Sequence, residues 1–118
     1  MAFQINFFDL ADLSPPTVGG PAPEMILEGN PIFRTWELDR DEAGNVTSGV
    51  WEATAGSWKS RKNGAWEFAT ILSGVVELGE MNGTPRTLRA GDSFVLRPDF
   101  YGIWKVRETV RKLWVIRG

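Results

Sequence analysis

From residue 32 to the end of the chain, apolar and polar residues alternate in short runs that are typical of β-strands. A bend at Gly56, a break at Ser73-Gly74 and a hairpin turn at Asn82-Gly83 separate several of these runs. Short strands at this spacing favour an all-β sandwich or barrel. The predicted strands are Ile32–Leu38, Val46–Ala55, Gly56–Arg61, Trp66–Leu72, Val75–Gly79, Thr87–Arg89, Ser93–Leu96, Gly102–Val106 and Val110–Ile116.

Residues 1–31 follow a different pattern, because five of the seven prolines lie there. Proline lacks a backbone N–H and restricts the residue before it, so we expect an irregular, extended arm with no more than a turn around residues 9–13. Phe3, Phe7, Phe8 and Leu10 are available to anchor this arm on the body or on a second subunit. We therefore divide the chain into an N-terminal arm, 1–31, and a β-barrel domain, 32–118.

The length and charge narrow the function classes. The 118 residues suit one domain, and a net charge of −2 from interspersed acidic and basic residues suggests no nucleic-acid face and no membrane patch. The chain has no cysteine, which excludes disulfides and thiolate metal sites. The first residues lack the pattern of a signal peptide and no run is long enough to span a membrane, so we expect a cytoplasmic protein.

The predicted strand Trp66–Leu72 carries a glutamate among apolar neighbours. Glu67 shares one face with Ala69 and Ile71, and the other face is largely apolar too, so we expect the strand to be covered on both sides. A carboxylate in such a place needs a partner, a proton or water. The alternative is that Glu67 lies near a strand end and reaches solvent.

The residues around Glu67 resemble the two motifs of the cupin superfamily. Gly56 precedes Glu67, Gly74 follows it seven positions on, and the run GDSFVLRPDFYGIWKV resembles the second motif. The runs GVWEATAG and TVRKLWVI resemble more specifically the ureidoglycine aminohydrolase-like and ethanolamine-utilisation-type cupins, many of them of unknown function. The resemblance spans residues 48–116. It implies a cupin double-stranded β-helix, a jelly-roll barrel, and a homodimer.

Most cupins with this pattern bind a metal through histidines, and this chain has none. Counted back from Glu67, the first-motif His-x-His pair falls on Arg61 and Asn63. Counted forward from Gly56, it falls one residue later, on Lys62 and Gly64. Neither count supplies an imidazole or a carboxylate.

In the second motif, Arg97 stands at the proline position and Gly102 at the histidine position. Only Glu67 remains of the four ligands, whereas Zn, Fe and Mn take three or four protein ligands. We therefore expect no metal and no other cofactor.

The chain has six tryptophans, each of which is a candidate for core packing. The cupin register also places Trp104 and Glu67 on the inner wall of the barrel. It places Arg61 and Asn63 at the mouth and Tyr101 at the rim. These five residues predict a pocket for a small polar organic molecule. We expect the basic run that contains Lys59, Arg61 and Lys62 to be a solvated loop.

Three functions remain open at this stage. The first is a metal-free cupin that binds a small polar metabolite. The second is an enzyme, resembling ureidoglycine aminohydrolases, that uses Glu67 as general acid or base; this role needs a raised pKa, which a nearby Arg61 or Arg97 would oppose. The third is a structural or interaction module whose contacts are made by the proline-rich arm and by exposed strands.

Overall fold

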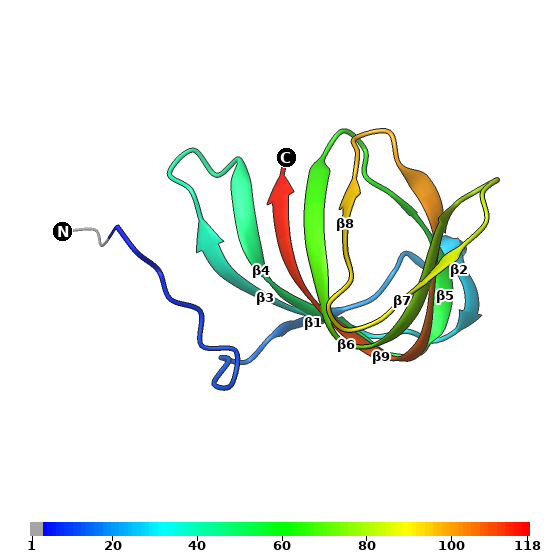
Figure 1. Cartoon of the computed structure of the whole chain (residues 1–118), viewed down its shortest axis with the longest axis horizontal. Coiled ribbons are helices and arrows are strands. Elements are labelled where there is room, and N and C mark those ends of the chain that lie inside the picture. The colour runs from blue at the N-terminus through cyan, green and yellow to red at the C-terminus, as the bar shows by residue number, and fades with distance from the viewer. Residues whose placement is uncertain (1–3) are drawn as a thin grey trace.

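The computed structural model describes residues 4–118, and this part of the chain is almost entirely β-structure (Figure 1). The predicted all-β jelly-roll barrel is confirmed. In chain order the elements are β1 (Thr17–Gly19), the 3-10 turn η1 (Pro23–Met25), β2 (Ile26–Gly29), β3 (Phe33–Arg40), β4 (Val46–Ala53), β5 (Gly56–Arg61), β6 (Trp66–Glu80), β7 (Arg86–Leu88), β8 (Ser93–Leu96) and β9 (Tyr101–Arg117).

Two long antiparallel strands, β6 and β9, form the middle of the barrel. The first half of β9 pairs with β5 and its second half with β4, while β6 pairs with β8 at its start and with β7 at its end. Each long strand therefore serves both halves of the curled sheet (Figure 1).

The sequence pattern predicted two strands on either side of Ser73-Gly74, but β6 is continuous there. Its register with β9 shifts between Ile71 and Val76, so the ladder survives through bulges. Gly74 has φ 88°, and a Cβ at this position would lie 2.2 Å from the carbonyl oxygen of Thr109. The glycine thus permits the bend that carries β6 from one half of the sheet to the other.

The N-terminal arm contributes to the sheet only late in its course. Residues 4–16 contain no strand, and the predicted turn is present, with Asp12 N–H donating to the Asp9 carbonyl at 3.3 Å. Beyond it, β1 pairs with β3 and β2 pairs with β5, so two short strands lie within the segment predicted to be irregular. Phe3 lies outside the described residues.

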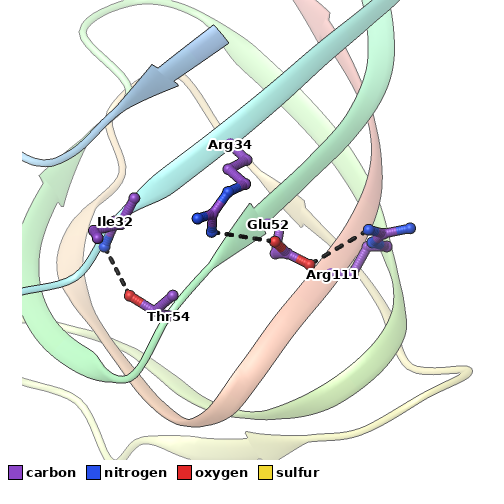
Figure 2. Close-up of polar contacts among 5 residues, drawn as sticks. All are labelled: Ile32, Arg34, Glu52, Thr54 and Arg111. Atoms are coloured by element: carbon purple, nitrogen blue, oxygen red, sulfur yellow. Dashed lines mark hydrogen bonds and ion pairs between the residues drawn. The ribbon is translucent and has the colours of Figure 1, made fainter. Parts of the chain in front are cut away.

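Polar side chains occupy part of the outer surface of the barrel. Glu52 on β4 lies between Arg34 of β3, at 3.6 Å, and Arg111 of β9, at 3.4 Å, as Figure 2 shows. Arg34 and Arg111 are the direct cross-strand partners of Glu52, which explains why the three charges form a row across the sheet.

The outer face of β6 corrects one expectation. Phe68 is 39% exposed, so the strand is not covered on both sides. The apolar outer face misled the prediction because aromatic residues are frequent in strands whether or not a layer covers them.

The core lies between the two halves of the curled sheet. Its apolar residues are joined by two buried charges, Glu67 and Lys112. Within residues 4–118, no helix is long and apolar enough to cross a membrane.

Candidate functional site

Three charged side chains meet inside the barrel: Lys62, Glu67 and Lys112, hereafter the charged triad. Glu67 is only 3% exposed, and both of its carboxylate oxygens are engaged. Lys62 Nζ donates to Oε1 at 2.8 Å, and Lys112 Nζ donates to Oε2 at 2.6 Å. The carboxylate is therefore partnered by two ammonium groups, which satisfies the requirement that its burial imposed.

Strand alternation decides which basic residue of the predicted run enters the barrel. Trp58 and Ser60 on β5 line the interior, and Lys62 continues their parity beyond the strand end. Arg61 has the opposite parity and is exposed. The expectation of a solvated basic run was therefore wrong for Lys62, whose side chain is 11% exposed.

Lys112 reaches the triad from the middle of β9. Its cross-strand neighbours are Trp51 on β4 and Ile71 on β6, so it is enclosed from both sides. Its Nζ lies 4.4 Å from the centroid of the Trp51 ring and 4.6 Å from that of Trp104. Both distances suit cation–π attraction, which adds to the ion pair.

An aromatic cluster, consisting of Phe33, Trp51, Trp58 and Trp104, lines the same pocket as the triad. Trp58 and Trp104 stack with an interplanar angle of 5° and a centroid distance of 6.1 Å. Trp51 meets Trp104 edge-on at 5.5 Å, and Phe33 lies 5.0 Å from Trp51 and 4.9 Å from Trp58. The packed rings thus form one apolar wall of the pocket, and the charged triad lies beside it.

The triad and the aromatic cluster line a partly open cavity of about 170 Å³, hereafter the aromatic cavity. Its remaining wall comes from β5 and β8. It is lined by Phe33, Trp51, Trp58, Ser60, Lys62, Glu67, Leu96, Trp104 and Lys112. A cavity of about 150 Å³ is large enough for benzene, so this one suits a ligand of about six non-hydrogen atoms.

Burial and charge act in opposite directions on the triad. Burial pushes the pKa of Glu67 upward, but the attraction of Lys112 and Lys62 outweighs it and leaves that pKa below its ordinary value. Burial lowers the pKa of Lys112, because Glu67 offsets only part of the desolvation and Lys62 adds repulsion. Glu67 is therefore ionised at neutral pH, so in the resting state it can accept a proton but has none to donate.

A metal does not fit this arrangement. Both oxygens of Glu67 already accept from ammonium groups, and residues 4–118 hold no cluster of three or more His, Cys, Asp or Glu suited to a metal ion. At Gly102, the position of the second-motif histidine, a Cβ would lie 2.1 Å from the Gly79 carbonyl oxygen. The backbone there leaves no room for any side chain, and hence none for a ligand.

The structure brings together two of the five predicted pocket residues. Glu67 and Trp104 both line the aromatic cavity. Arg61 instead lies over the ring of Tyr101, 3.6 Å from its centroid, and neither lines that cavity. Asn63 is exposed in a turn with φ 50°, followed by Gly64 with φ 91°, so its conformation serves the chain reversal before β6.

A larger hollow of about 830 Å³ opens between β7, β8 and the loop that follows β8. Its charged residues Glu80, Arg86, Arg97 and Asp99 are all exposed, so water screens them. The aromatic cavity, with its desolvated charges, is the better candidate for a specific site.

Sequence reasoning missed Lys112, Trp51, Trp58 and Phe33 as members of the site. A signal for Lys112 was available: in the run TVRKLWVI it shares its parity with Val110 and Trp114, so a charge interrupts an apolar face. The three rings offered no signal beyond their type, because the aromatic cluster joins four different strands.

Comparisons with solved structures support this fold. A protein of unknown function in the DUF861 family from Pseudomonas syringae is 28% identical over 91% of this chain and 45% of its own, with a TM-score of 0.77. This chain thus spans less than half of that relative.

Two further structures are similar to this chain in fold only. A putative ethanolamine utilization protein from Salmonella typhimurium is 16% identical over 72% of this chain and 68% of its own, with a TM-score of 0.62. A predicted oxalate decarboxylase from Thermotoga maritima is 17% identical over 87% and 91%, with a TM-score of 0.67.

A search of curated proteins found no significant match. Residues 40–114, more than half of the chain, match the family described as the EutQ-like cupin domain. This chain belongs to the EutQ-like cupin domain family.

Proposed function

We propose that the chain binds a small polar organic molecule in the aromatic cavity without the help of a metal. The observation that carries this proposal is the charged triad: two ammonium groups and one carboxylate are buried against indole rings beside open space. Such groups are costly to desolvate, and a small apolar pocket with a few convergent polar groups is typical of a ligand site.

The charge of the triad indicates the kind of molecule. Two cations face one anion, so one positive charge is left over within the cavity. Each ammonium carries three donors, and each uses one of them on Glu67. A ligand with a carboxylate would accept from the remaining donors, while its apolar part would lie on Trp51 and Trp104.

A ligand screen tests this proposal. Small organic acids, their amides and amines of similar size are titrated while tryptophan fluorescence and NMR shifts are followed. We expect acids to bind, and Lys62→Met to weaken binding at least about tenfold, or about 1.4 kcal/mol. Lys59→Met is the matched control, because Lys59 has the opposite parity on β5 and does not line the cavity. Binding that is equal in both variants, or a panel that never binds, would contradict the proposal.

The metal-free part has its own measurement. Protein purified without chelators is expected to contain no stoichiometric Mn, Fe, Ni or Zn by elemental analysis. Both carboxylate oxygens of Glu67, which would have to bind the metal, already accept hydrogen bonds from lysines. One equivalent of such a metal, lost in Glu67→Ala, would overturn it.

We also propose that two copies of the chain associate through the N-terminal arm. In the arm, Ile5 is 65% exposed and Phe7 86% exposed. On the outer face of the barrel, the cross-strand partners Phe68 and Val95 are 39% and 42% exposed. Apolar groups left open in this way mark interaction sites, and the arm of a second copy has the matching chemistry.

Light scattering at high micromolar concentration tests this association. We expect a dimer, with Phe7→Asp raising the dissociation constant about tenfold or more. Glu42→Gln, in the exposed loop between β3 and β4, is the control and is expected to change nothing. A strict monomer in the unsubstituted protein would rule out the dimer.

A further inference from the structure

We propose that Lys112 condenses with a small carbonyl compound that carries a carboxylate, so that the aromatic cavity holds an imine. This inference rests on the proposed function, because it names the ligand class of the same cavity and adds a covalent step. The charge and the cavity size argue for the class, and the position of the Lys112 amine argues for the bond.

The amine of Lys112 lies where a carbonyl carbon can approach it. Lys112 is 7% exposed, lines the aromatic cavity and lies close to the rings of Trp51 and Trp104. Burial disfavours its charged form, and Lys62, which shares the same carboxylate, adds repulsion. A desolvated lysine beside a second cation is a recognised way to make an amine nucleophilic at neutral pH.

Glu67 is placed to take the proton that must leave Lys112. The two groups already share a hydrogen bond of 2.6 Å, so the transfer needs no movement of the chain. Transfer gives a neutral amine and a neutral acid; because Lys112 and Lys62 hold the pKa of Glu67 below its ordinary value, the ion pair is the resting state and the neutral pair forms only as the carbonyl compound reacts. Lys62 stays charged at Oε1 and is available to bind the carboxylate of the incoming molecule.

The step balances without an oxidant or a reductant. The neutral amine of Lys112 forms a C–N bond to the carbonyl carbon, and the C=O π electrons move to oxygen, which takes a proton. The nitrogen then loses its second N–H proton, the C–N double bond forms and the oxygen leaves as water. Glu67 receives the nitrogen's protons and returns them to the departing oxygen.

The size of the cavity restricts the carbonyl compound. About 170 Å³ accommodates about six non-hydrogen atoms. Glyoxylate and pyruvate have this size, a carbonyl group and one carboxylate. They therefore serve as probes of the class, and acetaldehyde and acetone serve as matched neutral carbonyls.

Reductive trapping tests the imine. The unsubstituted protein is incubated with each probe and sodium cyanoborohydride, and the intact mass and peptide map are measured. We expect one adduct, with the mass of the probe plus two hydrogens less one water, at Lys112. Labelling of Lys112 should exceed that of Lys105 on the same strand, whose side chain is 40% exposed, by about tenfold or more. Acids should label Lys112 faster than neutral carbonyls do.

Two variants sharpen the result. Lys112→Arg keeps the charge but cannot form the imine, so the adduct should disappear, whereas Lys105→Arg should leave it unchanged. If Lys112→Arg does not fold, the distribution of label among the lysines of the unsubstituted protein decides the question alone. Label spread evenly over Lys59, Lys62, Lys105 and Lys112 would overturn the imine.

The failure of the imine and the failure of the site are distinguishable. Binding of pyruvate by NMR without label at Lys112 would overturn the covalent step and leave the proposed binding function standing. Absence of both binding and label across the acids would overturn both.

Discussion

Glu67→Gln is expected to lower the free energy of unfolding by about 3–5 kcal/mol at neutral pH. The substitution leaves Lys62 and Lys112 without their counter-ion, and water solvates Lys112 poorly because this side chain is only 7% exposed between β4 and β6. A loss of this size is a large part of the stability of a small domain. Urea unfolding followed by tryptophan fluorescence measures it.

Two controls separate the ion pair from the shape of the side chain. Glu77→Gln, on the same strand, removes a carboxylate paired with Arg107 on the surface and should cost no more than about 1 kcal/mol. Glu67→Gln/Lys112→Met removes the carboxylate and the more deeply buried of its two cations, leaves Lys62 with a side chain that is 11% exposed, and should recover part of the loss. If Glu67→Gln and Glu77→Gln lowered the free energy of unfolding equally, Glu67 would not be neutralising buried cations.

The pH dependence of the Glu67 effect has a definite sign. The folded pKa of Glu67 lies below its ordinary value of 4.5, so its stabilisation is present above pH 4.5 and is lost as the pH falls through the folded pKa. The gap between Glu67→Gln and the unsubstituted protein should therefore narrow in acid.

At alkaline pH, Lys112 should dominate the pH dependence of stability. Its folded pKa lies below the ordinary 10.5, so the unfolded chain binds the extra proton between these two values. The contribution of Lys112 to stability should rise with pH across that window, and Lys112→Met should abolish the rise.

Trp104→Ala is expected to cost about 3–5 kcal/mol, because a buried ring is removed from a wall that cannot collapse. Trp104 is 3% exposed and contacts Trp58, Trp51 and Phe94, with centroid distances of 6.1, 5.5 and 5.8 Å. Lys112 also loses one of its two cation–π partners. Urea unfolding measures the loss of stability, and the titration with small organic acids described under Proposed function measures the loss of ligand binding.

The control for Trp104 is an aromatic residue on the outer face. Phe68→Ala removes a ring that is 39% exposed, so it should cost about 1 kcal/mol or less in a monomer and leave ligand binding intact. If Trp104→Ala were as mild as Phe68→Ala, the aromatic wall would not be a rigid part of the barrel.

Much of the barrel follows from local pattern. Alternation gave Glu67 and Trp104 each a face, the resemblance to cupins marked that face as the inner one, and both residues line the cavity. The glycines at 56 and 74 marked real bends, since both have positive φ. The absence of histidine and cysteine excluded the usual ligands of a transition metal before any coordinates were known.

Other features depended on a single-residue choice that the sequence left open. The two counts for the first motif pointed to either Arg61 or Lys62, and neighbours on a strand face opposite sides. The pairing of β5 with β9 decides it: Trp58 and Ser60 face the cavity, and Lys62 shares their parity.

The buried ion pair itself belongs to the tertiary structure. Lys112 and Glu67 are 45 residues apart, and they meet because β9 lies between β4 and β6 in one particular register. Strand pattern gives each residue a face but not a neighbour, since many registers satisfy the same alternation. The residue types and their alternation could therefore be read from the chain, and the resemblance to cupins indicated which face is inner. The partner of Glu67, and with it the chemistry of the cavity, was decided by long-range pairing.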